Sequence, residues 1–584
     1  MHLRNRLGPG LLALSLLGGL ATASQAQNES PDFRSHPTTT PIRHLVVIFQ
    51  ENVSFDHYFA TYPTAANPAG EPRFIARDDT PSVNGLTQQL LQNNPNLGNP
   101  NRLDRSEALT CDQDHAYTPE QSATDHGAMD AFVQNTSDTS GGKPLTRGQC
   151  DIPTRSSPAN DFAVMDYYDG NTVTALWNYA QHFSMSDESF STTYGPSTPG
   201  ALNVTAGNTF PTLCAANAGT VAPGGNDPDV YDAAGNVKPC PGGISTKAPA
   251  GSEVGSGTGT MVSDADPYYD ACASASGTAA QGGRNIGDLL NEKGITWGWF
   301  QGGFSSPNYD PGESSTFDPA TICKGMHYNI GAGADKEGEP CTTSTPAKPI
   351  DAFCTLDYSP HHEPFQYFAS TSNPSHLPPS AINKIGKSDQ ANHQYDLKDF
   401  WAAVDHGNMP AVSYLKAERA QDGHAHNSSP LDEQRFLVDT INHLERTSDW
   451  DSTAVVILWD DSDGWYDHVL APVTTQSQTG LDTLTNAGQC GATTSQVPMG
   501  QQARCGLGPR QPLLIVSPFA KQNFVDHSTT DQSSVVTFIE DNWDLGRIGN
   551  GSTDATAGSL RNMFDFDNHE RVDRLFLDPM TGGR

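Results

Sequence analysis

Three short runs of apolar residues stand out from an otherwise polar chain. Residues 43–49, 454–459 and 512–516 are almost continuously apolar, which is typical of strands that are covered on both faces of a parallel sheet. Residues 434–444 and 533–543 instead place their apolar side chains at helical spacing. Strands separated by helices predict an α/β fold with a mostly parallel sheet flanked by helices.

The N-terminus has the pattern of a secretory signal peptide. Arg4 and Arg6 precede an apolar stretch at residues 11–20, and residues 24–26 form a small-x-small cleavage pattern. We therefore expect cleavage after Ala26 and a mature protein that is secreted or periplasmic.

The remainder of the chain divides by composition. The predicted parts are a polar, flexible lead-in at 27–42, a first part of the α/β core at 43–207, a Gly-, Pro- and Cys-rich segment at 208–349, and a second part of the core with a C-terminal tail at 350–584. We expect the third of these parts to be a disulfide-pinned inserted subdomain, or long loops over the core, because an unstapled loop of that length is rare.

Composition narrows the range of partners. The chain carries 67 acidic and 33 basic residues, a formal charge of −34, which argues against a nucleic-acid partner because phosphate backbones are bound by Lys and Arg. No stretch after residue 26 reaches the roughly 18 apolar residues of a membrane helix, so we expect no stable membrane insertion. The ten cysteines predict structural disulfides in an exported protein, with buried thiols as the alternative.

Oxygen-bearing side chains follow two of the predicted strands. Glu51 and Asn52 come directly after the first apolar run, and Asp460 and Asp461 after the second. Ligands of open α/β sheets bind beyond the carboxyl ends of the strands, and an all-oxygen donor set suits a hard metal ion. The alternative is that these acids cap helices or are solvated at the starts of loops.

A serine and several histidines are candidates for the chemistry itself. Pro199 suits the first turn of a helix, so Ser197 or Thr198 would be its cap. A serine at a helix N-terminus beside a metal could attack phosphorus, although a plain capping serine is the alternative. His115, His126, the pair His361 and His362, and His424 lie in polar surroundings. They could bind phosphoryl oxygens or protonate a leaving alkoxide, or be incidental surface residues.

Five motifs in order resemble the bacterial phosphoesterase family. They are ENxSFDHYF at 51–59, GPSTPGALN at 195–203, HHEPF at 361–365, QDGH at 421–424 and DDSDGWYDH at 460–468. That family contains secreted phospholipases C and acid phosphatases with an alkaline-phosphatase-like fold, and the resemblance extends from about residue 43 to residue 546.

The resemblance implies roles for individual residues. Glu51, Asn52, Asp460 and Asp461 would hold one metal ion together with the Ser197 hydroxyl, and Ser197 would be phosphorylated transiently. The residues implied for the phosphate pocket are His115, Asn203, His361, His362 and His424, with one histidine as the general acid. The metal could be calcium, magnesium, manganese, iron or zinc, since oxygen ligands admit all of them.

We therefore predict a secreted, metal-dependent phosphoesterase that hydrolyses phosphate monoesters through a phosphoserine, as acid phosphatases do. Many members of the phospholipase C type carry threonine in a Gly-Pro-Thr-x-Pro-Asn-Arg context, whereas this chain has Ser197 followed by Gly200 and Ala201. The alternatives are a phospholipase C that cleaves phospholipid head groups, and a secreted binding protein with an inactive site. The expected partners are small phosphate esters or phospholipids.

Overall fold

The computed structural model describes residues 37–150, 160–210, 212–215, 258–273, 278–333, 335–342, 353–474, 505–567 and 571–584. The predicted signal peptide at 1–26 and most of the predicted lead-in lie outside these residues. Among the described helices, none is both long enough and apolar enough to cross a membrane.

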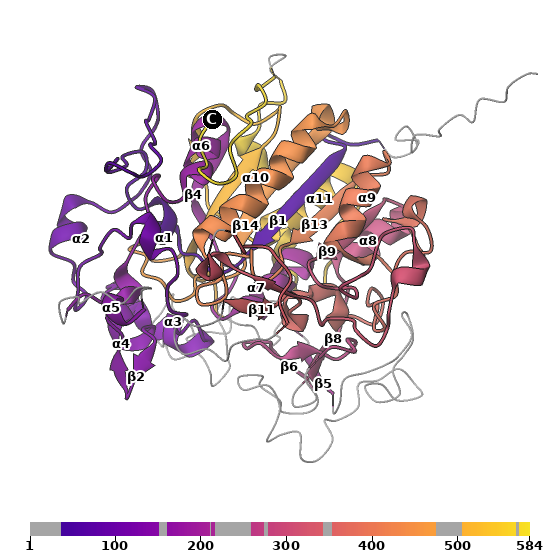
Figure 1. Cartoon of the computed structure of the whole chain (residues 1–584), viewed down its shortest axis with the longest axis horizontal. Coiled ribbons are helices and arrows are strands. Elements are labelled where there is room, and N and C mark those ends of the chain that lie inside the picture. The colour runs from indigo at the N-terminus through magenta and orange to yellow at the C-terminus, as the bar shows by residue number, and fades with distance from the viewer. Residues whose placement is uncertain are drawn as a thin grey trace, which may run out of the picture.

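A nine-stranded sheet forms the centre of the molecule (Figure 1). The strands run in the order β12-β9-β13-β1-β14-β15-β4-β16, and β17 also pairs with β4. Their bounds are β1 His44–Gln50, β4 Ser184–Phe190, β9 Trp297–Gln301, β12 Gln394–Asp396, β13 Val412–Lys416, β14 Thr453–Trp459, β15 Arg510–Val516, β16 Phe524–Asp526 and β17 Thr530–Asp531. All neighbouring pairs are parallel except those that β15 makes with β14 and β4. The predicted α/β fold with a mostly parallel sheet is confirmed.

The three predicted strands are β1, β14 and β15, and every residue in them is buried. Such burial requires cover on both faces, which explains their continuous apolar sequences. The strand β15 nevertheless runs antiparallel to β14, which a continuous apolar sequence does not reveal.

Helices cover the sheet, with α9 and α10 in front of it in Figure 1. The helix bounds are α1 Phe55–Phe59, α2 Gln88–Gln92, α3 Tyr117–Ala123, α4 Phe132–Asn135, α5 Arg147–Cys150, α6 Thr174–His182, α7 Ser197–Ala206, α8 Ile286–Lys293, α9 Leu397–Asp405, α10 Pro430–Arg446 and α11 Ser533–Trp543. Both helices predicted from periodicity are present. In α10, Pro430 occupies the first turn and the Ser429 hydroxyl caps the helix by accepting from Leu431 N and Asp432 N.

The segment predicted as an insertion, 208–349, contributes to two different parts of the fold. A separate four-stranded sheet contains β5 Thr212–Ala215, β6 Thr258–Gly259, β7 Asp266–Pro267 and β8 Thr278–Gln281. Of the next elements, α8 packs its apolar side chains into the main core, and β9 joins the central sheet by pairing with β12 and β13. The aromatic sequence of β9, WGWFQ, lacks the long aliphatic run that identified the other central strands.

Two small antiparallel pairs complete the described strands. They are β2 Thr139–Ser140 with β3 Lys143–Pro144, and β10 Met326–Tyr328 with β11 Cys354–Leu356. Three disulfides confirm the prediction from cysteine number: Cys111–Cys150, Cys272–Cys323 and Cys341–Cys354. Cys505 is also disulfide-bonded. Cys240 and Cys490 lie outside the described residues.

Candidate active site

Strand register brings the two predicted acidic motifs together at one edge of the sheet. The strand β1 lies between β13 and β14, with Gln50 opposite Trp459. The residues that follow, Glu51 and Asp460, therefore leave the sheet side by side. The two motifs are 408 residues apart in sequence, yet Asn52 N donates to Asp460 Oδ1 at 3.2 Å.

Ser197 reaches this edge from a third parallel strand. A six-residue loop joins β4 to α7, and Glu120 fixes this loop by accepting from Gly195 N at 2.7 Å and from Ser462 Oγ. The helix α7 then begins at Ser197, and its cap position is Pro196. The expectation that Ser197 or Thr198 caps the helix is therefore corrected. The Ser197 hydroxyl bonds to carboxylates across the site instead of to its own backbone.

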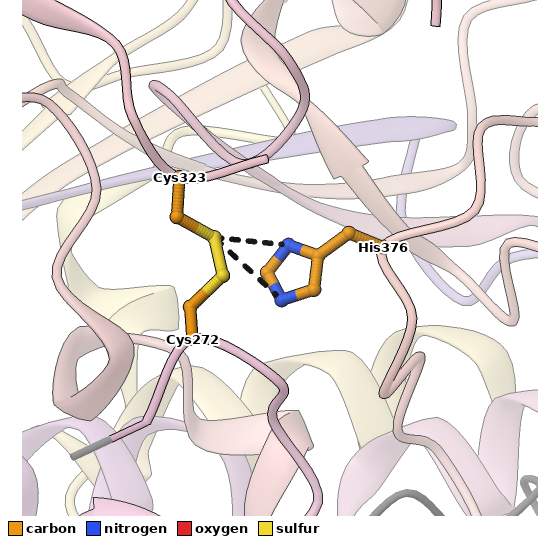
Figure 2. A group of neighbouring side chains, drawn as sticks. All are labelled: Cys272, Cys323 and His376. Atoms are coloured by element: carbon orange, nitrogen blue, oxygen red, sulfur yellow. Dashed lines mark hydrogen bonds between the residues drawn. A yellow bond between two sulfur atoms is a disulfide. The ribbon is translucent and has the colours of Figure 1, made fainter. Parts of the chain in front are cut away.

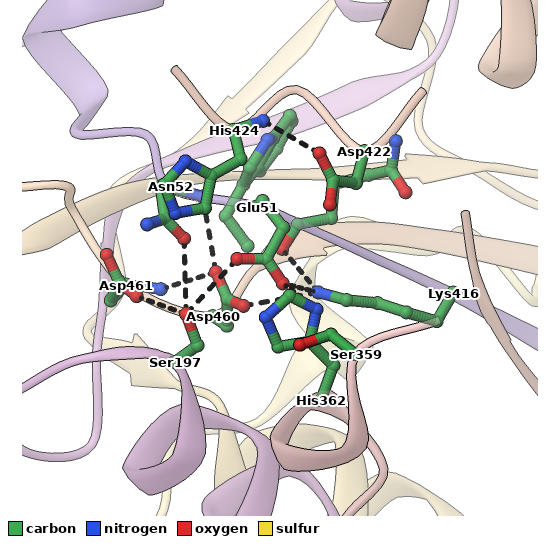
Figure 3. Close-up of polar contacts among 12 residues, drawn as sticks. Glu51, Asn52, Ser197, Ser359, His362, Lys416, Asp422, His424, Asp460 and Asp461 are labelled. Atoms are coloured by element: carbon green, nitrogen blue, oxygen red, sulfur yellow. Dashed lines mark hydrogen bonds and ion pairs between the residues drawn. The ribbon is translucent and has the colours of Figure 1, made fainter. Parts of the chain in front are cut away.

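The Ser197 hydroxyl points from α7 toward the carboxylates and the Asn52 amide (Figure 3). Its Oγ is 3.0 Å from Asp461 Oδ2, 3.1 Å from Glu51 Oε2 and 3.5 Å from Asn52 Oδ1. Ser197 is 2% exposed, and the four predicted metal-binding residues are each 1% exposed or less. The serine and the four predicted ligands are thus brought together in one buried, oxygen-rich group.

The Asn52 side chain shows how this group could accept a cation. One end of its amide lies 2.7 Å from Glu51 Oε2, 3.0 Å from Asp460 Oδ1 and 3.1 Å from Asp461 Oδ2. With the amide nitrogen at this end, Asn52 donates to all three carboxylates, and its oxygen accepts from His424 Nε2 at 3.1 Å. With the oxygen at this end, four oxygens converge on one point, which is the donor set of a hard cation. The backbone of Asn52 is left-handed, with φ of 50°, a conformation that asparagine tolerates.

The carboxylates carry more negative charge than the described side chains neutralise. Burial and the neighbouring Asp460 raise the pKa of Glu51 well above its usual range. Burial raises the pKa of Asp461 in the same way, with a contribution from Asp460. Burial also opposes ionisation of Asp460, but the attraction of Lys416 and its hydrogen bonds keep that pKa below the usual value. A bound cation would relieve this excess of negative charge.

Lys416 is a site residue that the sequence did not identify. It ends β13, is fully buried, and forms ion pairs with Glu51 Oε1 and, at 3.1 Å, with Asp460 Oδ2. Its strand, VSYLK, is short and partly polar, so its pattern did not predict a central strand. The available signal was a lysine at the end of a strand-like segment directly before the QDGH motif.

Two of the predicted histidines lie beside the carboxylates. His362 Nδ1 is 3.1 Å from Glu51 Oε1, and burial together with the charges of His361 and Lys416 holds the His362 pKa well below its usual value. The His361 ring packs edge-on against the ring of His362 at 4.4 Å and is partly exposed, with Nδ1 3.4 Å from Asp266 Oδ1.

The other two predicted histidines lie on the Asn52 side of the cluster. The rings of His115 and His424 are 5.9 Å apart. Burial lowers the pKa of His424 to about 4. Burial also opposes the charge on His115, but the attraction of Asp461 and Asp463 and that of Asp112 raise its pKa well above the usual value. Asp112, His115, His424 and Asp463 offer ligand atoms within 4.8 Å of one another, so this side of the site could also bind a cation.

Asn203, the last predicted pocket residue, lies further along α7. It is buried, and its Nδ2 donates to Thr193 Oγ1 at 3.3 Å, in the loop that precedes the helix. Its role in a phosphate pocket remains a prediction. His126, the alternative to His115, lies in the 3-10 helix Asp125–Gly127.

The motifs also contain residues that hold the site together. Arg510, fully buried at the start of β15, donates from Nε to both Asp467 oxygens at 3.2 Å and from Nη2 to Asp56 Oδ1 at 3.1 Å. His468 Nδ1 lies 2.6 Å from the other Asp56 oxygen. Arg510 thus connects the segment after β1 to the segment after β14.

A cysteine-containing group elsewhere has metal-like spacing but not the required chemistry. Cys272, Cys323 and His376 offer donor atoms within 4.8 Å of one another. The two sulfurs, however, form a disulfide, and Cys323 Sγ lies 3.6 Å from His376 Nδ1 (Figure 2). Metals bind the thiolate form of cysteine, so in this oxidised state the group is structural.

Several known proteins resemble this chain in sequence. A family model described as "Phosphoesterase family" matches residues 42–546. The chain is 36% identical over 140 residues to "Non-hemolytic phospholipase C" of Burkholderia pseudomallei, covering 24% of this chain and 19% of that protein. It is 28% identical over 167 residues to "Non-hemolytic phospholipase C" of Pseudomonas aeruginosa, covering 28% of this chain and 24% of that protein.

A mycobacterial relative also matches only part of this chain. "Phospholipase C B" of Mycobacterium tuberculosis (strain H37Rv) is 25% identical over 179 residues, covering 29% of this chain and 32% of that protein. The matched regions thus span between a fifth and a third of these relatives. A solved structure described as a protein in the alkaline phosphatase superfamily from Vibrio parahaemolyticus is 14% identical, covers 66% of this chain and 64% of that chain, and has a TM-score of 0.24.

Proposed function

Since this chain belongs to the phosphoesterase family, we propose that it is a metal-dependent hydrolase of phosphate esters with the Ser197 hydroxyl as its nucleophile. The observation that carries the proposal is the position of Ser197 Oγ, within 3.1 Å of carboxylate oxygens from both Glu51 and Asp461. A serine at a helix N-terminus suits attack on an electrophile that brings negative charge, and the buried acids beside it would admit such a group once a bound cation balances them.

The donor set supports one metal ion, held by Glu51, Asn52, Asp460 and Asp461. Three carboxylates and one amide oxygen suit a hard cation such as calcium, magnesium or manganese, and iron or zinc also accept such ligands. Bound there, the metal would neutralise the carboxylates and favour ionisation of a nearby hydroxyl. The same position would favour direct contact with the Ser197 hydroxyl.

The proposed reaction has two steps. In the first, Ser197 Oγ attacks phosphorus and transfers its proton to a neighbouring carboxylate. The bond from phosphorus to the ester oxygen breaks, and a pocket histidine protonates the leaving oxygen. In the second step, water attacks the phosphoserine and gives a proton to the histidine that protonated the leaving group, the bond from phosphorus to Oγ breaks, and Oγ regains its proton from the carboxylate. Lys416 and the histidines would position the phosphoryl oxygens and balance their charge.

We propose phosphate monoesters as the preferred substrates, as in acid phosphatases, because the GPSTPGA sequence around Ser197 resembles that side of the family. Phospholipase C activity is a second candidate, favoured by the names of the curated relatives. Both reactions would use the same centre. They differ in whether the site accepts a diester that carries a lipid.

We also propose that the protein acts outside the cytoplasm. Three described disulfides support this location, because such bonds persist in oxidising compartments. The residues of the predicted signal peptide are compatible with export by their sequence.

Parallel assays of p-nitrophenyl phosphate and p-nitrophenyl phosphorylcholine, at acid and neutral pH, test the function. We expect faster cleavage of the monoester by the wild type and no turnover by Ser197→Ala. Thr205→Ala is the matched control, since that hydroxyl lies in the same helix and donates to Ala201 O and Leu202 O. Faster cleavage of the choline diester would favour phospholipase C. Full activity of Ser197→Ala would exclude this serine as the nucleophile.

Acid quenching during turnover tests the covalent step. Mass spectrometry of the quenched wild type should find one added phosphoryl group on the peptide that contains Ser197. The same peptide of Ser197→Ala should carry none. A wild-type enzyme that turns over without this modification would contradict the phosphoserine intermediate.

A further inference from the structure

A second group of side chains that could bind a metal shares no residue with the proposed catalytic site. His327 Nδ1 is 2.8 Å from Asp357 Oδ1 and 3.2 Å from Glu418 Oε2. The ligand atoms of the three residues all lie within 4.8 Å of one another. His327 is on β10, Asp357 follows β11, and Glu418 comes two residues after the end of β13. Three separate segments of the chain therefore converge on this point.

These side chains form one wall of a cavity of about 200 Å³. Asp396, which is 5% exposed, also lines this cavity, so three carboxylates surround it. Lys398 is a lining residue too, but its Nζ donates to the carbonyl oxygens of Pro307, at 3.1 Å, and Tyr309, at 3.4 Å. The cavity thus sets three carboxylates against the basic side chains of His327 and Lys398, so its acids outnumber its bases and a bound cation would balance the excess.

The buried Ser305 hydroxyl is a second observation, independent of the acidic cluster, that points to a ligand. Ser305 lines the same cavity and is 4% exposed, and its hydroxyl has no hydrogen-bond partner among the residues that the structure describes. Buried hydroxyls without a partner are uncommon, because the lost interaction with water is costly. A metal ion, or a water molecule bound to one, would give this hydroxyl a partner.

Glycines leave the space that the carboxylates need. A Cβ atom at Gly325 would lie 2.2 Å from Asp357 Oδ2, and one at Gly302 would lie 2.7 Å from the Glu418 Cβ. Both positions line the cavity and exclude larger residues. The cluster is thus closely packed on the main-chain side and open toward the cavity, where further ligands or water could enter.

We propose that His327, Asp357 and Glu418 form a second metal site, for a divalent transition metal of the manganese, iron or zinc type. One imidazole nitrogen with two carboxylates suits these ions better than calcium or magnesium, which favour oxygen ligands alone. Ser305 Oγ and water would complete the coordination from the cavity. The site is separate from the proposed catalytic centre, and its existence does not depend on the reaction there.

The position of this site suggests what the metal would do. Glu418 is two residues from Lys416, and Asp357 is four residues from His361. A metal that joins Asp357 to Glu418 would fix these two segments relative to each other and to β10. The proposed site is therefore a structural one that positions residues of the catalytic centre.

Metal content of the full-length protein tests the proposal. Wild type, Glu418→Gln, His327→Gln and the exposed control Glu339→Gln are treated with chelator, loaded with Mn²⁺ or Zn²⁺, desalted and analysed by plasma mass spectrometry. We expect Glu418→Gln and His327→Gln each to bind one equivalent of metal less than wild type. The control Glu339→Gln should bind as much metal as wild type. Metal content equal to wild type in either cavity variant would overturn the proposal.

Two further measurements keep this result separate from the catalytic centre and from misfolding. Asp461→Asn should lose the metal ion of the catalytic centre and keep that of the second site. The double variant Asp461→Asn with Glu418→Gln should therefore lose two equivalents of metal. Cobalt loading should give a visible absorption band for imidazole ligation in Asp461→Asn, and that band should be absent after His327→Gln is added. Unchanged cobalt spectra would also overturn the site, and circular dichroism checks the fold of each variant.

Discussion

Gly200 in α7 packs so closely against Asp460 that a Cβ atom at Gly200 would lie 2.1 Å from the Asp460 carbonyl oxygen. This contact places the first turn of α7, and with it Ser197, directly against the end of β14. No side chain can occupy the position without moving either the helix or the strand end. The distance between Ser197 and Asp461 therefore depends on the absence of a Cβ atom one helical turn away.

We predict that Gly200→Ala separates Ser197 from the carboxylates. Overpacking of this kind costs about 1–3 kcal/mol of stability, and a displaced nucleophile can lose roughly 100-fold in turnover. Hydrolysis of p-nitrophenyl phosphate and thermal unfolding would measure the two effects. Gly583→Ala is the control, because its nearest neighbour, Thr581 Oγ1, is 3.5 Å away. A fully active Gly200→Ala would show that the contact does not position Ser197.

Lys416→Met should destabilise the metal-free protein more than the metal-loaded protein. The substitution leaves Glu51 and Asp460 buried without their lysine partner, which costs about 3–5 kcal/mol when no other cation is present. A bound metal would compensate for part of this loss. Melting temperatures with chelator and with saturating metal give the comparison, and the exposed Lys387→Met is the control. Equal stability of Lys416→Met and wild type in chelator would contradict the prediction.

Arg510→Met should reduce stability by about 3–5 kcal/mol, because it removes the buried guanidinium that pairs with both Asp56 and Asp467 and leaves only His468 beside Asp56. Arg510→Lys should recover only part of that loss, since a lysine cannot reproduce the planar set of donors. Urea unfolding of both variants, with Arg561→Lys as an exposed control, tests this order. A lysine variant as stable as wild type would show that charge alone suffices.

The buried carboxyl group of Glu433 should make the free energy of unfolding decrease as the pH rises. Burial raises its pKa from 4.5 to about 8, although Tyr58 OH and Trp459 Nε1 both donate to it. Between these two pH values the folded state keeps a proton that the unfolded state has released. The stabilising contribution of protonated Glu433 to the free energy of unfolding is therefore fully present below pH 4.5. It falls by about 1.4 kcal/mol per pH unit until about pH 8.

Glu433→Gln should remove this part of the pH dependence. Urea unfolding of the variant and of wild type at several pH values between 4.5 and 8 measures the difference in slope. We expect the free energy of unfolding of Glu433→Gln to fall less steeply with pH than that of wild type. The difference in slope should correspond to one bound proton. The exposed control Glu339→Gln should keep the wild-type slope. Parallel curves for wild type and Glu433→Gln would mean that Glu433 does not retain its proton in the folded state.

The apolar runs at 43–49, 454–459 and 512–516 were sufficient to predict three central strands, because a strand buried on both faces must be apolar throughout. The same reasoning failed for β9 and β13, whose sequences are short and mixed with polar or aromatic residues. Their place in the sheet depends on pairing with distant strands, which periodicity within one segment does not reveal. The antiparallel direction of β15 is likewise visible only in its pairing with β14 and β4.

The type of fold, the candidate nucleophile and metal ligands, and their meeting at strand ends could all be predicted without a structure. The charged partners that hold these residues in place could not. Lys416 lies between Glu51 and Asp460 because β13 pairs with β1 in a parallel register. Arg510 joins Asp56 to Asp467 because β15 lies beside β14. Such contacts depend on the order and register of strands far apart in the chain, so they arise only when the sheet is assembled.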